Sequence, residues 1–270
     1  MLHVFLPALA FALVVTADVN RNFIAVPIAA GVVVLVCTGT VFAVYRLIPW
    51  ARKIPGPAFG VMALAASYGN VTYLGLPIIT EMLGTELGYV AVLYDLVAST
   101  PLLLTLGAFI SARYGSGKVM SPAESLKRVI MLPPLWAVVA GIVVRLGGVE
   151  MPKLVLDTAG IMGKPVIPIM MFTVGLALDF RDVKRLPMAV PALAIKLILA
   201  PILAWWVGSR LGVTGKVLEA ITIEGATPVM VLSLVIADEF ELDVPLAAAC
   251  IAVSTVALFF TMPIMMKMLF

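Results

Sequence analysis

Charged residues are scarce in this sequence. They make up 12% of its 270 residues, whereas hydrophobic residues make up 63% and the mean hydropathy is +1.15. A soluble domain carries roughly 25% charged residues, so this chain has too few to solvate its surface on every side. We therefore expect most of the surface to face lipid. The net charge of +3 does not indicate a nucleic-acid partner, because the basic residues fall between the apolar segments, as membrane topology requires.

Histidine and cysteine are nearly absent. The one histidine, His3, has no cysteine or carboxylate cluster near it in the sequence, so we expect neither a metal site nor a cofactor. Cys37 and Cys250 lie in apolar stretches, where buried reduced thiols are expected rather than a disulfide. The chain also has no Gly-x-Ser-x-Gly motif and no paired-aspartate motif. An intramembrane enzyme would therefore lack a catalytic set.

Long apolar runs, by contrast, are abundant. They continue over ~20 residues, the length of an α-helix that crosses a bilayer, whereas membrane β-strands alternate apolar and polar residues in ~10-residue blocks. The sequence therefore predicts an all-α polytopic membrane protein with about nine transmembrane helices. The predicted spans are 1–17, 23–45, 57–80, 87–113, 129–147, 153–178, 187–209, 215–237 and 244–267. The first ends like a signal peptide, but no Lys or Arg precedes its apolar core and eight spans follow, so we expect it to be retained.

Basic residues concentrate in alternate loops. The loops after the second, fourth and sixth spans hold ten Lys and Arg residues, against five in the loops after the first, third, fifth and seventh. The ten are Arg46, Arg52, Lys53, Arg113, Lys118, Lys127, Arg128, Arg181, Lys184 and Arg185; the five are Arg21, Arg145, Lys153, Arg210 and Lys216. Because cytoplasmic loops carry the positive excess, we expect a cytoplasmic N-terminus and an external C-terminus in the plasma (inner) membrane.

Two predicted spans are interrupted near their centres. The span 57–80 carries Gly69, Asn70, Gly75 and Pro77, and the span 215–237 carries Glu224-Gly225-Ala226-Thr227-Pro228. Gly and Pro cost about 1 and 3 kcal/mol in a helix interior, so each span is expected to break into two half-helices. In the second, Thr227 is expected to cap, and Pro228 to start, the second half-helix. The alternative is an ordinary kink in each of two packed helices.

The chain also shows a weak internal repeat. Phe5-Leu6-Pro7-Ala8-Leu9 resembles Val166-Ile167-Pro168-Ile169-Met170. Pro77 of the first interrupted span follows 70 residues after Pro7, and Pro228 of the second follows 60 residues after Pro168. One unit starts in the cytoplasm and the other outside, so the repeat is inverted. We expect a first repeat over 1–113, a cytoplasmic linker over 114–128 and a second, inverted repeat over 129–270. Inverted repeats with an interrupted helix in each half point to a midplane substrate site.

The two interruptions are the candidate binding site. A half-helix N-terminus leaves backbone N–H groups unpaired and carries a partial positive charge, so two that meet at the midplane would bind an anion. The Asn70 amide and the Thr72 and Thr227 hydroxyls would add polar contacts to a carboxylate. The full predicted set is Gly69, Asn70, Thr72, Gly75, Pro77, Gly225, Thr227 and Pro228.

These motifs resemble the auxin efflux carrier family. The matching segments are Asn70 with Leu74-Gly75-Leu76-Pro77, Leu93-Tyr94-Asp95, Pro134 to Gly141, Val174-Gly175-Leu176-Ala177-Leu178, Lys196 with Pro201, and Ala226-Thr227-Pro228. The resemblance covers essentially the whole chain in order. It implies ten helices in two inverted units of five, of which the fourth and ninth cross, and organic anion substrates such as auxin or small carboxylates. The family is related to the bile acid/sodium symporter superfamily.

The chain departs from the family pattern in two places. It is expected to begin at the family's second helix, because Leu6-Pro7-Ala8-Leu9 lies almost at its N-terminus. Leu132 also stands where relatives often have Asn. These departures put in doubt any dimer contact or scaffold role that the first helix has in the family, and they leave a homodimer open.

Several charged residues lie inside the predicted spans, namely Asp95, Lys164, Lys196, Glu219 and Glu224. Each costs about 2.5–3.5 kcal/mol at the bilayer centre on insertion scales, so they should pair or line water. We expect a Lys196–Glu224 ion pair and hypothesise that Glu224 or Asp95 is the site of a coupling proton. The alternative is a static structural pair or a side chain that faces water.

The leading hypothesis for function is a secondary carrier of small organic anions in the lipid bilayer, working by alternating access with proton coupling or by facilitated diffusion. A sodium-coupled symporter of the bile-acid type is the first alternative, since Glu224, Thr227, Asn70 and Thr72 offer a few oxygen ligands. A receptor or scaffold on the same fold that does not transport is the second, because a fold does not settle an activity.

Overall fold

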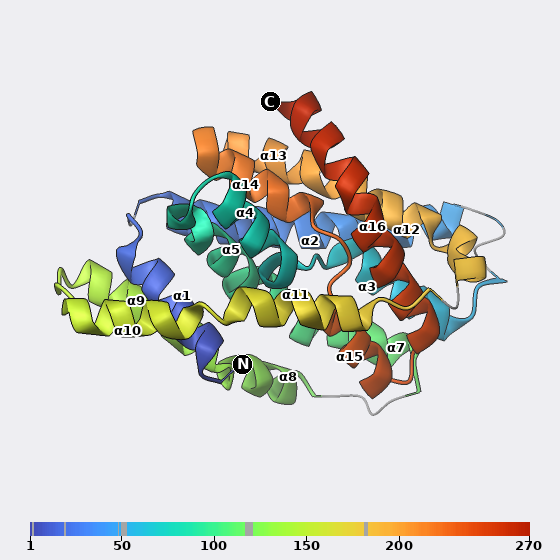
Figure 1. Ribbon diagram of the computed structural model, residues 1–270. Helices are drawn as coiled ribbons and strands as arrows, with labels where there is room; N and C mark the ends of the chain where they lie inside the picture. The colour runs from blue at the N-terminus through green and yellow to red at the C-terminus, as the bar shows by residue number, and fades with distance from the viewer. Residues whose placement is uncertain (2, 19, 48, 50–52, 117–120, 181–182) are drawn as a thin grey trace.

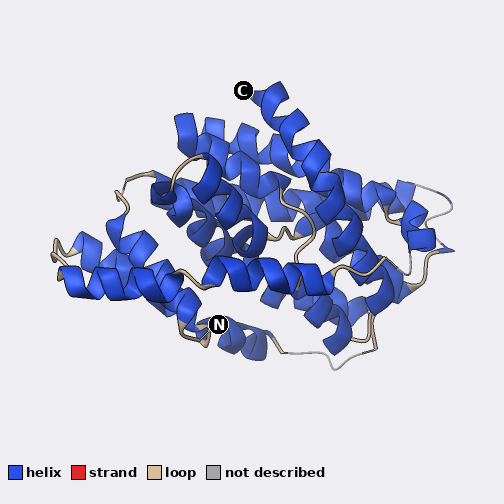
Figure 2. Ribbon diagram, viewed as in Figure 1, coloured by secondary structure: helices blue, strands red, loops and turns tan. Residues whose placement is uncertain are grey.

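The computed structural model describes residues 1, 3–18, 20–47, 49, 53–116, 121–180 and 183–270. Within these ranges the chain is almost entirely helical and no β-strand occurs (Figure 2). One isolated antiparallel β-bridge joins Gly69 and Val229. The predicted cytoplasmic residues Arg52, Lys118 and Arg181 lie outside the described ranges.

Helices occur within every one of the predicted apolar ranges. The α-helices are α1 (Phe5–Thr16), α2 (Asn22–Leu47), α3 (Gly56–Ser67), α4 (Leu76–Met82), α5 (Gly88–Leu93), α6 (Thr100–Leu102), α7 (Ala108–Tyr114), α8 (Pro122–Ile130), α9 (Pro133–Leu146), α10 (Lys153–Gly163), α11 (Val166–Ala177), α12 (Val190–Ala194), α13 (Ala200–Arg210), α14 (Gly215–Ala226), α15 (Leu232–Glu239) and α16 (Val244–Leu269). Between them lie π-helical turns η2 (Val71–Gly75), η4 (Tyr94–Ser99), η5 (Leu103–Gly107) and η7 (Ile195–Leu199), and the 3₁₀ turns η3 (Thr85–Leu87) and η6 (Val183–Met188).

Five helical stretches in the described part of the chain are long and apolar enough to cross a membrane. They are Asn22–Leu47, Thr85–Tyr114, Lys153–Ala177, Val190–Arg210 and Val244–Leu269. A sixth is reached if Ala123–Ile130 and Pro133–Leu146, bent by 60°, count as one span. The fold is therefore a polytopic membrane helical fold, and the count of nine spans stays a prediction because the remaining apolar helices are short or interrupted.

The helices form two packed groups (Figure 1). In the first, which we call the end group, α1 packs on α9 and α10. In the second, the core group of α2–α7 and α12–α16, α2 packs on α3 and α13, α13 on α14, and α16 on α3 and α14. α11 continues from α10 across the core group and contacts η2 and α16.

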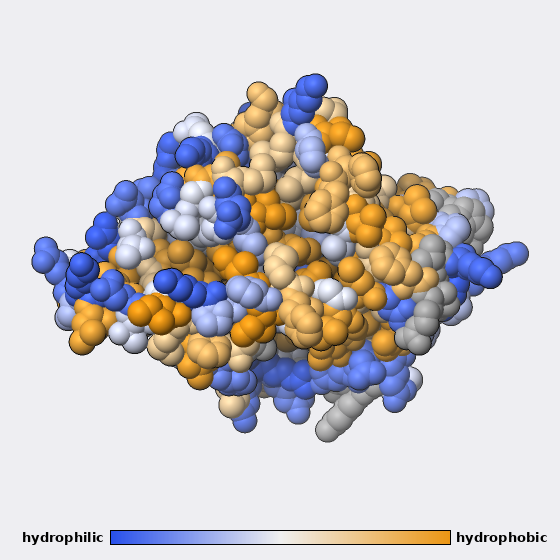
Figure 3. Space-filling view, in the orientation of Figure 1, coloured by the Kyte–Doolittle hydropathy of each residue, from blue (hydrophilic) through white to orange (hydrophobic). Residues whose placement is uncertain are grey.

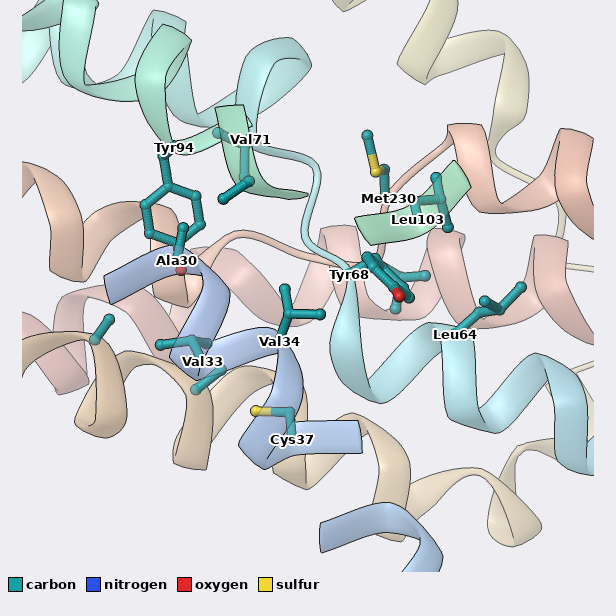
Figure 4. Close-up of a cluster of buried hydrophobic side chains, with 14 of the residues drawn as sticks. Ala30, Val33, Val34, Cys37, Leu64, Tyr68, Val71, Tyr94, Leu103 and Met230 are labelled. Atoms are coloured by element: carbon teal, nitrogen blue, oxygen red, sulfur yellow. The ribbon is translucent and has the colours of Figure 1, made fainter. Parts of the chain in front are cut away.

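The principal hydrophobic core lies mostly in the core group, where it includes residues of both interruptions, and it extends to Ala10 and Val14 of α1. Figure 4 shows Tyr68 and Met230, one from each interruption, together with Leu103 of η5. The outer face is also apolar over a broad area, with hydrophilic residues toward the margins (Figure 3). Along α10 and α11, Leu154, Phe172 and Leu176 are each more than half exposed, as expected of side chains that contact lipid.

Ion pairs and hydrogen bonds tie the loops together at the surface. Arg128 and Arg185 pair with Glu239 and Asp243 respectively. All four residues lie in or beside loops that the alternation of the predicted spans places in the cytoplasm, the loop after the eighth span included. On predicted external loops, Arg145 pairs with Asp18 at 3.2 Å, and Lys216 donates to the Leu83 carbonyl at 3.1 Å. Each of these four contacts joins loops predicted to lie on the same side of the membrane.

The Arg128–Glu239 pair should make a small, pH-dependent contribution to stability. Both guanidinium Nη atoms of Arg128 donate to the Glu239 carboxylate, at 2.8 and 2.5 Å, and this lowers the pKa of Glu239 from its ordinary 4.5. A group with a depressed folded pKa stabilises above its unfolded pKa and loses that contribution as the pH falls through the folded value. Because the side chains are 43% and 35% exposed, Arg128→Gln should cost at most about 1 kcal/mol near neutral pH.

The difference in Tm between wild type and Arg128→Gln, measured on detergent-purified protein, should shrink as the pH is lowered below the ordinary glutamate pKa of 4.5. The charge swap Arg128→Glu with Glu239→Arg should restore part of the loss that either single change causes. A difference that stays constant down to low pH would mean that Arg128 stabilises through packing alone.

Candidate functional site

The first interruption separates α3 from α4. α3 ends at Ser67, Tyr68 is extended (φ −111°, ψ 122°), Asn70 is non-helical (φ −82°, ψ 61°), and the chain re-enters helix through the π-helical turn η2. Such π-turns are rare and occur often at functional sites. Pro77 is the second residue of α4, directly after η2, and a local π-helical adjustment is one way in which a membrane helix accommodates the N–H that proline lacks.

The second interruption separates α14 from α15 and is longer than the sequence suggested. Thr227 is extended (φ −56°, ψ 148°), the conformation favoured before a proline. α15 begins only at Leu232, so the expectation that Pro228 starts the second half-helix was wrong. The Thr227 hydroxyl does not cap that half-helix either. It donates back to the Glu224 carbonyl at 2.7 Å and so helps to end α14.

The two interruptions pair with each other through their backbones. The Asn70 N–H donates to the Pro228 carbonyl at 2.8 Å, and the Met230 N–H donates to the Tyr68 carbonyl at 3.1 Å. The Val229 N–H donates to Ser254 Oγ of α16 at 3.0 Å. These contacts satisfy polar groups that would otherwise be unpaired at membrane depth, at a cost of several kcal/mol each.

Asp95 occupies the position where the sequence predicted a bound anion. Its carboxylate accepts hydrogen bonds from the Thr72 hydroxyl and from the Thr100 hydroxyl at 2.7 Å, and the Thr72 backbone is a further donor. The side chain is 4% exposed. The donors at the start of the η2 half-helix are thus already bonded to a carboxylate of the protein itself, that of Asp95.

A cavity of about 240 Å³ lies beside this carboxylate, between the end group and the core group. Its walls are mostly apolar; the lining residues are His3, Leu6, Asn70, Thr72, Tyr73, Asp95, Leu96, Thr100, Leu104, Met131, Leu132, Pro133, Pro134, Met230 and Leu232. The Asn70 side chain is 2% exposed, and its Nδ2 has no hydrogen-bond partner among the described residues. A buried amide N–H without a partner is costly, so Nδ2 is available to a ligand in this cavity.

Behind the cavity, the crossing holds two buried charged residues. Lys196 Nζ donates to the Gly225 carbonyl at 2.6 Å, and Gly225 itself packs against α13. Both carboxylate oxygens of Glu224 lack a hydrogen-bond partner in the described structure. The expected Lys196–Glu224 ion pair is therefore not formed here, because the ammonium bonds the carbonyl one residue further along the chain.

Two of the predicted glycines are required by close approach. A Cβ at Gly69 would lie 2.9 Å from Lys196 Nζ and would collide with Thr227 Oγ1. A Cβ at Gly75 would collide with the Glu224 carboxylate. Gly69 thus leaves room for the side chains of Thr227 and Lys196, and Gly75 leaves room for that of Glu224.

The structure separates the predicted residues into two sets. Asn70, Thr72 and Asp95 line the cavity, whereas the others lie at the crossing or, like Pro77, beyond it, and do not line it. That second set is Gly69, Gly75, Pro77, Lys196, Glu224, Gly225, Thr227 and Pro228. Of the other intramembrane charges, Lys164 is exposed and Glu219 is partly exposed.

Sequence reasoning missed Thr100 and the 131–134 segment. Thr100 lies five residues after Asp95, a spacing that faces the same way only because η4 is π-helical. The segment Met131–Pro134 forms the bend between α8 and α9, and it reaches the cavity through tertiary packing. Pro133-Pro134 marks the bend in sequence but gives no sign of what it faces.

Comparison with known proteins gives consistent matches. A family model described as "Membrane transport protein" matches residues 1–266. An uncharacterized transporter of Methanothermobacter thermautotrophicus is 27% identical over 98% of this chain and 85% of its own length. The uncharacterized transporter MJ1031 of Methanocaldococcus jannaschii is 24% identical over 94% of this chain and 83% of its own length. The uncharacterized transporter YfdV of Escherichia coli is 23% identical over 76% of this chain and 66% of its own length.

The Thr72 hydroxyl should contribute measurably to stability through Asp95. Thr72→Val removes one donor from a buried carboxylate and should cost about 1–3 kcal/mol, whereas Thr72→Ser keeps the hydroxyl. The Tm of the two purified variants, compared with wild type, measures the effect. If Thr72→Ser lost stability while Thr72→Val kept it, the methyl group rather than the hydroxyl would be what Thr72 supplies.

Proposed function

Because this chain belongs to the membrane transport protein family, the auxin efflux carrier family that its motifs resemble, we propose that it is a secondary carrier of small organic anions. The cavity between the end group and the core group carries this proposal. It is enclosed mainly by apolar side chains, and it presents the unpartnered Asn70 amide beside the Asp95 carboxylate. An amide N–H is a donor to a carboxylate, and the apolar walls suit the hydrocarbon part of a small acid.

Asp95 is the proposed coupling site. It is the acidic residue among those that line the cavity, and an ionised Asp95 would repel an anionic substrate by about 4 kcal/mol at 4 Å for an effective dielectric constant of 20. A proton on Asp95 removes that repulsion, so anion and proton would move together. Glu224, the other candidate, does not line the cavity and is the less suitable of the two.

The proposed architecture is nine crossings in two inverted repeats, 1–113 and 129–270, joined by the linker 114–128. The surface contacts support this topology, since each of the four described above joins loops assigned to the same side. Most of α8 lies in the linker. This helix has a capping box at Ser121 and Glu124 and suits a helix at the cytoplasmic surface. The N-terminus would then be cytoplasmic and the C-terminus external in the inner membrane.

Alternating access would follow from movement of one group against the other. The substrate residues Asn70, Thr72 and Asp95 all belong to the core group, whereas Leu6 and Pro133 on the opposite wall belong to the end group. A displacement of the core group relative to the end group would carry the site while the paired interruptions stay intact.

Uptake of labelled small carboxylates into proteoliposomes, driven by a pH jump, tests the carrier. Wild type should accumulate its substrate, and Asn70→Ala should raise KM about tenfold or more, the value of a hydrogen bond to a charged group. Asn20→Ala, on an exposed loop, is the matched control and should behave as wild type. Saturable binding without exchange of labelled substrate in counterflow would identify a receptor instead.

Amide substitutions separate the two carboxylates. Asp95→Asn should abolish pH-driven accumulation while counterflow exchange persists, because the amide cannot carry the proton but adds no negative charge. Glu224→Gln should keep the pH response. The reverse pattern would assign the proton to Glu224, and an unchanged pH response in both variants would end the proton-coupling proposal.

A further inference from the structure

Lys196 places a positive charge between the two interruptions. Its side chain is 2% exposed, and Nζ donates to the Gly225 carbonyl of the second interruption at 2.6 Å. On the other side, Nζ and Cε lie against Gly69 of the first interruption, where a Cβ would be 2.9 Å from each. Thr227 Oγ1 lies against the same glycine. The ammonium therefore contacts both broken helices at once.

The oxygens around this point favour a cation. α14 ends at Ala226, so the Gly225 and Glu224 carbonyls lie in its last turn, where the helix dipole is negative. The Thr227 hydroxyl gives its proton to the Glu224 carbonyl and so keeps its lone pairs free. Glu224 is 0% exposed, and neither of its carboxylate oxygens has a hydrogen-bond partner in the described structure. The carboxylate lies against Gly75 of the first interruption, so it adds a buried negative charge to the same region without a direct ion pair to Nζ.

Carbonyl, hydroxyl and carboxylate oxygens at the end of a broken membrane helix are the ligands that coupling cations use. A buried carboxylate without hydrogen bonds is costly unless a cation compensates it. In this chain the nearby cation is covalently attached, since Lys196 is the residue whose ammonium reaches that turn.

We propose that the Lys196 ammonium is a tethered cation that fills a small monovalent-cation site between the two interruptions, with Glu224 as its counter-charge. The chain consequently needs no Na⁺ to hold the crossing together, and removing the ammonium opens a site of Na⁺-binding oxygens. The inference adds to the proposed carrier function a reason for independence from sodium. The binding part of it stands without any transport measurement.

Thermal unfolding of the purified full-length protein tests the site directly. Tm is measured in NaCl, in KCl and in choline chloride at equal ionic strength, because choline is too large for the vacated space. Wild type should show the same Tm in all three salts. Lys196→Ala should have a lower Tm in choline and a rise of several degrees that saturates with Na⁺ concentration. Lys164→Ala, which changes an exposed lysine, should remain insensitive to the salt.

A second substitution tests the counter-charge. Lys196→Ala combined with Glu224→Gln should lose the Na⁺-dependent rise, because the carboxylate supplies the negative charge of the site. If Lys196→Ala does not fold, Lys196→Met keeps the apolar stem without the charge, and binding of radioactive Na⁺ to it replaces the Tm readout. Sodium stabilisation of wild type, or a folded variant that neither gains stability from Na⁺ nor binds it, would overturn the proposal.

Transport separates this inference from the carrier proposal. If both hold, wild-type uptake is independent of Na⁺ and Lys196→Ala uptake becomes dependent on it. A Na⁺-dependent Tm in Lys196→Ala without uptake in any variant would keep the tethered cation and reject the carrier. Uptake by wild type, together with no Na⁺ response in folded Lys196→Ala, would keep the carrier and reject the tethered cation.

Discussion

Free backbone groups in two broken helices constrain the centre of this structure more than any side chain does. At membrane depth no water is available to pair them, so a helix can stop there only where another element supplies partners. Tyr68 and Asn70 find theirs on Pro228 and Met230, two hydrogen bonds of an antiparallel bridge. Neither interruption could exist alone, and the pair therefore fixes how α3, α4, α14 and α15 lie relative to one another.

Polar side chains become possible in the core because of this crossing. Thr72 starts a half-helix turn whose donors hold Asp95, and the end of α14 supplies the carbonyl that holds Lys196. Each charge meets the end of a helix with the opposite partial charge. Two buried ionisable residues are thus accommodated without a direct ion pair between Lys196 and Glu224.

The position of the cavity follows from the two-group packing. The crossing supplies the polar wall, and the end group supplies an apolar wall through Leu6 and the bend at Pro133. A surface that is polar on one side and apolar on the other suits a small amphipathic acid. Because the backbone pairing between the two interruptions lies wholly inside the core group, the two walls of the cavity can separate without breaking it.

The sequence by itself determined the membrane class, the positions of the apolar helices and the existence of both interruptions, because hydrophobic run length and Gly or Pro content act locally. It also indicated Asn70, Thr72 and Asp95 as candidate site residues, since polar residues in an apolar span are few. Tertiary structure alone decided that Asp95 bonds Thr72 and Thr100, that Lys196 bonds Gly225 instead of Glu224, and that α15 starts at Leu232. Those outcomes depend on π-helical turns and on backbone pairing between segments about 160 residues apart. Neither can be predicted from a local sequence pattern.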